Sequence, residues 1–225
     1  MDSISTQAVS FDVGGTLIEP WPSVGEVYAE VAAAHGFSNL PVDQINAQFR
    51  RAWKEKVDFQ YTEAGWLGIV TSSFADLIAA EDCTKFFPDL YRRFESPDVW
   101  RIHNDVLPTL DDLAGRGFRL AVVSNWDNRL RPLLKNLKLL SFFETATISG
   151  DIGFTKPSPV PFEFTLKKLG LPPHALVHVG DSTSEDIDGA ERAGITGILV
   201  RRGQPEKSHA LTNLTQLSAL LNESW

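Results

Sequence analysis

Residues 9–17 have the sequence VSFDVGGTL: a short apolar run, an aspartate and then a glycine turn. The run at 7–11 and four later ones, at 118–124, 145–149, 175–180 and 195–200, are β-branched or aromatic in character. Several of them do not alternate with polar residues, which is typical of strands buried on both faces of a parallel sheet. We therefore expect five strands, the first of them directly before Asp12.

Helical patterns separate the later strands, at 129–140, 160–169 and 184–193, and a further helix is expected at 105–115, between an aspartate and a glycine. Strands that alternate with helices through short loops favour a doubly wound α/β fold with a parallel sheet and a Rossmann-like core.

The stretch at 20–100 differs from the rest because it shows helical spacing and little strand character. We expect it to form several helices inserted after the first strand. The sequence thus predicts two domains, an α/β core made of 1–19 and 101–225 and a helical cap domain made of 20–100.

Composition narrows the class of protein. The 225 residues carry a net charge of −8, which argues against non-specific nucleic-acid binding. A single cysteine allows no intrachain disulfide. No apolar run approaches the roughly 20 residues of a membrane helix, and the N-terminus does not resemble a secretory signal. We expect a cytoplasmic protein with no nucleic-acid or membrane partner; the sequence leaves its oligomeric state open.

Polar side chains follow the predicted strands at the edge where an open parallel sheet binds ligands. Asp12, Ser124, Lys156 and Asp181 all come just after a strand. An aspartate there can act as a nucleophile, a hydroxyl and an ammonium can bind a phosphoryl group, and two carboxylates can hold a hard cation. The glycine turn after Asp12 is expected to direct backbone N–H groups toward an anion.

Four motifs in this order resemble those of the haloacid dehalogenase superfamily. They are the D-x-D-x-T pattern at 12–16, Ser124 at a strand end, Lys156 before a proline, and Gly-Asp at 180–181 with Asp186 beyond it. Each motif alone is weak, but the four together, around an insert at 20–100, are specific. The sequence SNWDNRL at 124–130 is similar to the rhythmically expressed gene 2-like branch of that superfamily.

The resemblance implies a Mg²⁺-dependent phosphohydrolase with an α/β core, a helical cap and a small phosphorylated metabolite as substrate. The site residues that it implies are Asp12 as nucleophile with Ser124 and Lys156 as catalytic residues; Asp12, Asp181 and the carbonyl of Gly14 as metal ligands; Gly15, Thr16 and Asn125 as substrate-binding residues; and Asp186 in support.

One position departs from the pattern. Most phosphatases of the superfamily carry an acid two residues after the nucleophile, and this chain has Gly14 there. General acid–base catalysis is typically worth about 10²–10⁴-fold. Three explanations are open. The leaving group needs no proton, or another residue replaces the acid, with Asp127, His35, Arg50 and Lys54 as candidates. Alternatively, the chain is a catalytically weak phosphate-binding or regulatory protein.

A halide also leaves without a proton, so Gly14 keeps a haloacid dehalogenase or a phosphonate-cleaving enzyme open as alternatives. Dehalogenation needs no metal, whereas Asp181 and Asp186 resemble a retained Mg²⁺ site. On that ground the sequence favours phosphoryl chemistry over dehalogenation.

Overall fold

The computed structural model describes residues 6–57, 59–203 and 210–223. Their chain forms two compact units. One unit comprises the described residues of Met1–Glu19 and Ile102–Trp225, and the other comprises those of Pro20–Arg101.

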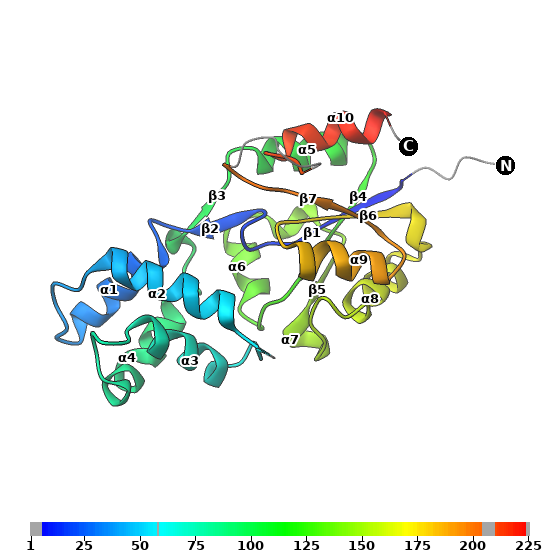
Figure 1. Cartoon of the computed structure of the whole chain (residues 1–225). Coiled ribbons are helices and arrows are strands. Elements are labelled where there is room, and N and C mark those ends of the chain that lie inside the picture. The colour runs from blue at the N-terminus through cyan, green and yellow to red at the C-terminus, as the bar shows by residue number, and fades with distance from the viewer. Residues whose placement is uncertain (1–5, 58, 204–209, 224–225) are drawn as a thin grey trace. The chain divides into compact units, whose positions relative to one another are not determined.

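The first unit contains a five-stranded parallel sheet (Figure 1). Its strands, in spatial order, are β5 (Thr145–Ile148), β4 (Arg119–Ser124), β1 (Ala8–Phe11), β6 (Leu176–Gly180) and β7 (Thr196–Leu199). Every neighbouring pair is parallel. The five strands lie where the sequence predicts them, and the predicted α/β fold class is confirmed.

Helices cover both faces of this sheet. In Figure 1, α5 (Val106–Gly115) and α10 (Thr215–Glu223) pack together on one side, and α8 (Val160–Leu169) and α9 (Asp188–Arg192) lie on the other. All residues of β1 and β6 are buried, as expected of strands between two layers of helices. Since the central strands are rigidly packed on both faces, the loops at their carboxyl ends start from fixed points.

Two predicted helices differ from the structure. The pattern at 129–140 gives only α6 (Leu130–Asn136), because the chain turns at Lys138, where φ is 60°. The pattern at 184–193 gives a π-helical turn, Thr183–Ile187, followed by α9. In that turn the N–H of Ile187 donates to the carbonyl of Ser182, and the wider turn brings the carboxylate of Asp186 back to the Ser182 N–H. A short helix α7 (Ser149–Ile152) was not predicted from the sequence.

The second unit is built from α1 (Val24–Ala34), α2 (Val42–Glu55), α3 (Glu63–Ser73) and α4 (Ala80–Arg93). The helices enclose an apolar core rich in aromatic rings, in which Tyr28 and Phe74 stack with their ring centroids 5.7 Å apart. Thus the residues that carry helical spacing in the sequence do form helices around a core of their own.

A two-stranded sheet lies where the chain passes between the units, and the sequence analysis did not anticipate it. It pairs β2 (Ile18–Pro20) with β3 (Trp100–Ile102), directly after a 3₁₀ turn at Pro97–Val99. Both strands have three residues, too short for a periodic pattern to be recognised. Among the described residues no helix has the length and hydropathy to cross a membrane.

Candidate active site

The carboxyl ends of β1, β4 and β6 lie side by side, because β1 pairs in parallel with both other strands. Asp12 follows β1, Ser124 ends β4, and Asp181 follows β6. Three of the four side chains predicted from the sequence to meet at this edge therefore come from adjacent strands.

Asp12 is held by two hydrogen bonds to a single oxygen. Ser124 Oγ donates to Asp12 Oδ1 at 2.9 Å, and Lys156 Nζ donates to the same oxygen at 2.7 Å. Oδ2 receives no hydrogen bond from residues 6–57, 59–203 or 210–223. The pKa of Asp12 is raised to about 7, because burial, together with the neighbouring Asp186 and Asp181, outweighs the lowering effect of Lys156. The carboxylate is thus oriented by one oxygen and open at the other.

Lys156 brings a positive charge into the buried end of the site. Its side chain is 1% exposed, and Nζ donates to Asp12, to Asp186 and to the carbonyl of Val123. Burial alone lowers the pKa of Lys156, but the two carboxylates outweigh burial and hold the pKa above its ordinary value. All three ammonium protons therefore have acceptors.

Asn125 fixes the backbone of Lys156. The N–H of Lys156 donates to Asn125 Oδ1 at 2.7 Å, and Asn125 Nδ2 donates back to the carbonyl of Lys156 at 2.9 Å and to Glu185 Oε2 at 3.1 Å. The amide of Asn125 therefore positions the lysine. Its predicted role in substrate binding stays a prediction.

Asp186 anchors a buried chain of polar groups that the sequence analysis missed. Besides Lys156, its carboxylate accepts from the N–H of Ser182 at 2.9 Å and pairs with His178 Nε2 at 3.2 Å. The other ring nitrogen of His178 lies 2.9 Å from Ser10 Oγ. Burial holds the pKa of His178 below its ordinary value, so we treat it as neutral, with a proton on Nε2. Burial would raise the pKa of Asp186, but Lys156 and His178 hold it low.

The sequence does contain a signal for this buried set of hydrogen-bonded polar residues. Ser10 and His178 are polar residues inside otherwise apolar strands, and the register of β1 with β6 pairs them. A histidine and a serine in buried strands need hydrogen-bond partners, and adjacent parallel strands supply them here.

The turn after Asp12 is closely packed against its neighbours. Gly15 has φ of 77°, and a Cβ at Gly15 would lie 2.5 Å from Asp181 Oδ2, so glycine is required there. The N–H of Gly15 donates to the carbonyl of Ile18 at 2.8 Å, so in this structure it closes the turn. The predicted role of Gly15 in substrate binding stays a prediction.

Thr16 is buried and tied to a distant arginine. Its carbonyl accepts hydrogen bonds from Arg202, whose guanidinium also pairs with Asp105 at 2.9 Å. Thr16 Oγ1 is buried without a hydrogen-bond partner in the described part of the chain. The backbone of Thr16 thus fixes the turn, and substrate binding by its side chain stays a prediction.

Position 14 carries no acid, and the geometry of Asp127 disfavours it as a replacement. Both oxygens of Asp127 accept hydrogen bonds from the buried side chain of Arg129. This two-pronged ion pair engages both oxygens of the carboxylate in the loop. His35, also considered from the sequence, pairs with Asp89 at 2.9 Å within the helical unit. The side chains of Arg50 and Lys54, in α2, are exposed.

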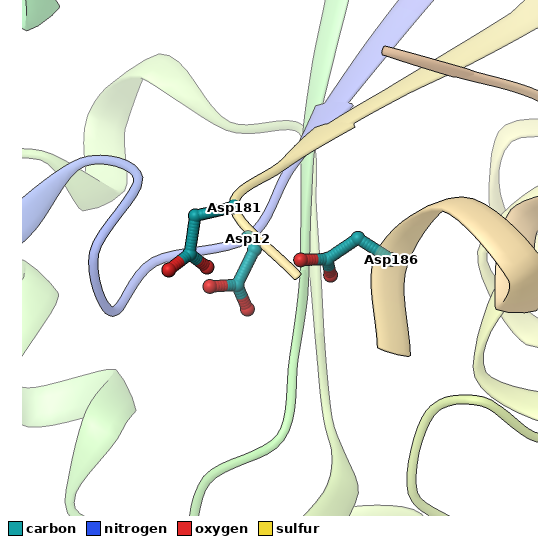
Figure 2. Close-up of side chains that lie close together, drawn as sticks. All are labelled: Asp12, Asp181 and Asp186. Carbon is teal, nitrogen blue, oxygen red and sulfur yellow. The ribbon is translucent and has the colours of Figure 1, made fainter. Parts of the chain in front are cut away.

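Three carboxylates are close enough to hold one cation. An oxygen of Asp12, one of Asp181 and one of Asp186 all lie within 4.8 Å of one another (Figure 2). In Figure 2 the carboxylates of Asp12 and Asp181 lie side by side, and that of Asp186 reaches toward them from a neighbouring helical segment. The pKa of Asp181 is raised to about 6, because burial and the neighbouring Asp186 outweigh the lowering effect of Lys156. The donor set is all oxygen, which Mg²⁺ prefers, so these residues fit the cation.

The motifs, the sheet and the carboxylate cluster agree with one family of enzymes, and comparison with known proteins supports the same conclusion. The family model for haloacid dehalogenase-like hydrolases matches residues 6–194. This chain belongs to the haloacid dehalogenase-like hydrolases. The superfamily resemblance inferred from the four motifs is therefore confirmed.

Curated relatives place the chain in the predicted branch of these hydrolases. It is 31% identical over 212 residues to haloacid dehalogenase-like hydrolase domain-containing protein 3 of Danio rerio, covering 89% of this chain and 87% of that protein. It is 27% identical over 224 residues to the rhythmically expressed gene 2 protein of Drosophila melanogaster, covering 90% and 84% of the two chains.

Solved structures with a similar fold include members with two different chemistries. A HAD phosphatase from Thermococcus onnurineus has a TM-score of 0.69 and 26% identity, covering 96% of this chain and 98% of that one. A 2-haloacid dehalogenase from Pseudomonas syringae has a TM-score of 0.65 and 25% identity over the same shares. Membership in the family therefore makes this chain hydrolase-like, and the reaction has to be argued from the site.

Proposed function

We propose that this protein is a Mg²⁺-dependent phosphohydrolase that uses Asp12 as nucleophile on a small phosphorylated metabolite. The observation that carries the proposal is the environment of the Asp12 carboxylate. Ser124 and Lys156 hold Oδ1, while Oδ2 accepts nothing from the described residues. An oriented carboxylate beside a buried ammonium suits an attack on an electron-poor phosphorus.

The reaction divides into two displacements at phosphorus. Asp12 Oδ2 forms a bond to phosphorus, the bond from phosphorus to the leaving oxygen breaks, and its electron pair departs with the leaving group. Water then bonds to the same phosphorus, the bond to Asp12 breaks, and phosphate leaves with the carboxylate restored. One proton of that water goes to the released phosphate or to the departed anion, so atoms and charge balance.

Each neighbouring group has a defined task in these steps. Lys156 balances negative charge on Asp12 and on the phosphoryl oxygens, and Ser124 Oγ is placed to donate to a phosphoryl oxygen once substrate binds. Asp186 keeps the ammonium of Lys156 in place. Asp12, Asp181 and the carbonyl of Gly14 would hold Mg²⁺, with Asp186 in support. The cation would supply further charge neutralisation at the phosphoryl group.

The substrate is further limited by the helical unit and by position 14. We propose that Pro20–Arg101 acts as a cap domain that recognises the part of the substrate that does not react and excludes water, which favours a small metabolite. Because Gly14 cannot donate a proton, acyl and aryl phosphates suit the site better than alkyl monoesters. We expect the protein to act in the cytoplasm.

Phosphate release tests the proposal. Wild type and Asp12→Asn would be assayed on para-nitrophenyl phosphate and acetyl phosphate, with Mg²⁺ and with a chelator. We expect activity that needs both Mg²⁺ and Asp12. Asp111→Asn, at an exposed position of α5, is the matched control and should keep full activity. A folded, Mg²⁺-binding wild type that hydrolyses neither compound would favour a phosphate-binding or regulatory protein instead.

Dehalogenation is the second candidate, because a halide leaves without a proton and a 2-haloacid dehalogenase shares the fold. It would use Asp12 Oδ2 to displace halide from carbon. The two reactions separate cleanly in one assay: halide release from a 2-haloacid in the presence of chelator would support this candidate. A phosphonate-cleaving reaction would instead release an aldehyde.

A further inference from the structure

The ring of Trp126 occupies the space next to Gly14. A Cβ built at Gly14 would lie 3.3 Å from Trp126 Cζ3, closer than nine in ten Cβ contacts in proteins. The backbone of Gly14 does not have a positive φ, so its conformation would accept other residues. The neighbouring indole, and not the backbone, therefore crowds a side chain at position 14.

The backbone of Trp126 is firmly held. Its N–H donates to Ser149 Oγ at 2.9 Å, and its carbonyl accepts from the same hydroxyl at 2.9 Å and from the N–H of Gly150 at 2.8 Å. The next residue, Asp127, forms the buried ion pair with Arg129. Because the loop is fixed on both sides of Trp126, a side chain at Gly14 would need the indole ring to shift by a few tenths of an ångström while its backbone stays in place.

Trp126 also lies in the part of the chain that carries the chemistry. It follows Ser124, which donates to Asp12, and Asn125, which holds Lys156. Trp126 is half-buried, and the edge of its ring reaches Gly14, the residue two positions after Asp12. An aromatic surface at this place is apolar and offers no acid proton.

We infer that Trp126 is a specificity-determining residue, which keeps an acid out of position 14 and gives the leaving group an apolar, aromatic wall. The inference rests on the proposed phosphohydrolase function. It names the substrate class more narrowly: a phosphate whose leaving group departs as a stable anion and is planar or apolar, such as an aryl or aromatic acyl group. In the first displacement the electron pair of the breaking phosphorus–oxygen bond stays on that group, and no proton is needed.

A double-mutant cycle tests this inference with Gly14→Asp, Trp126→Ala and the double variant. The substrates are para-nitrophenyl phosphate, acetyl phosphate and glycerol phosphate, an alkyl ester. Trp126→Ala should lower kcat/KM for the nitrophenyl ester about three- to tenfold more than for acetyl phosphate. Gly14→Asp alone should gain little on glycerol phosphate, whereas the double variant should gain about 10²-fold over wild type, because the acid then has room.

Trp126→Phe is the conservative variant and should keep most of the preference for the nitrophenyl ester. Gly14→Asp alone reaching the alkyl activity of the double variant would overturn the inference. So would equal losses on the nitrophenyl and acetyl compounds in Trp126→Ala.

Thermal unfolding of the wild type and the three variants of the double-mutant cycle separates this inference from the proposed function. Steric coupling predicts that Gly14→Asp lowers Tm in the wild-type background and lowers it far less in the Trp126→Ala background, whether or not any phosphate is hydrolysed. Equal decreases in both backgrounds would show that the indole does not restrict position 14. If no phosphate is hydrolysed but the Tm decrease caused by Gly14→Asp depends strongly on Trp126, the phosphohydrolase proposal is wrong, while the steric relationship between Gly14 and Trp126 still holds.

Discussion

Lys156 Nζ lies 2.7 Å from Asp12 Oδ1 and donates to Asp186 as well, so one buried ammonium group serves two carboxylates. The shared ammonium explains how the buried carboxylates of Asp12 and Asp186 can lie close together at the carboxyl edge of the sheet. Removing the ammonium would leave like charges facing each other without water.

We expect Lys156→Ala to lose activity and stability together. The free energy of unfolding should fall by about 3–5 kcal/mol, since the variant leaves buried charges uncompensated. Urea unfolding measures the change, and Lys135→Ala, at an exposed position of α6, should stay within about 0.5 kcal/mol of wild type. Equal stabilities of the two variants would show that the ammonium does not offset the carboxylates.

His178 should act by positioning Asp186. His178→Phe keeps an aromatic ring beside Phe162 but removes the partner of Asp186 and of Ser10, so we expect a loss of about 1–3 kcal/mol in unfolding free energy. We also expect a lower kcat with little change in KM, because the effect reaches the substrate through Lys156. His178→Gln, which keeps a donor, should recover part of both losses. If the Phe and Gln variants behave alike, hydrogen bonding by His178 is not what matters.

The pH dependence of Mg²⁺ binding follows from the raised pKa values of about 7 for Asp12 and about 6 for Asp181. A carboxyl with a raised pKa keeps its proton to higher pH in the folded chain than in the unfolded one. The metal-free protein should therefore lose stability as pH rises from about 4 toward 7. Mg²⁺ competes with those protons, so its affinity should rise over that range and binding should release protons.

Calorimetric titration with Mg²⁺ at about pH 5.5 and about pH 8, each in two buffers of different ionisation enthalpy, measures both quantities. Equal affinities at the two pH values, with no proton release, would contradict the assignment of Asp12 and Asp181 as ligands.

Asp105 pairs with Arg202, which also holds the turn after Asp12, so the ionisation of Asp105 should affect the stability of the protein in acid. Burial would raise the pKa of Asp105, but hydrogen bonds from Arg202 and from the N–H of Leu214 outweigh it and hold the pKa below its ordinary value. Its contribution to stability is therefore present above the unfolded-state pKa of about 3.9 and is lost as pH falls below it. Asp105→Asn should cost about 1–3 kcal/mol at neutral pH and less in acid. Urea unfolding at about pH 7 and about pH 3 checks this, with Asp111→Asn as control.

The sequence predicted the residues at the strand ends because each follows a recognisable apolar run. Asp12, Ser124 and Asp181 needed only the rule that parallel strands present their carboxyl ends at one edge. Lys156 and Asp186 lie farther along the segments that follow their strands, so the strand rule places Lys156 near this edge and the family motifs assign the roles of both residues. The hydrogen bonds that connect Lys156 to both acids were beyond any pattern, since they depend on how those loops fold.

The contacts that could not be predicted from the sequence join segments that lie far apart in the chain. Ser10 meets His178 only once the strand order is known, and Arg202 reaches Thr16 across most of the chain. The fit between Gly14 and Trp126 depends on side-chain placement. Periodicity reports which face of an element is buried, and it carries no information on which partners share that face.

Trapping the phosphoryl group on Asp12 shows whether this carboxylate is the nucleophile. Mg²⁺-loaded protein would be mixed with acetyl phosphate for less than one turnover, quenched in acid, digested and analysed by mass spectrometry. We expect one added phosphoryl group on the peptide that contains Asp12, removable by hydroxylamine and absent in Asp12→Asn. Phosphate release with no modified Asp12 peptide at any quench time, or with the group on another residue, would contradict it.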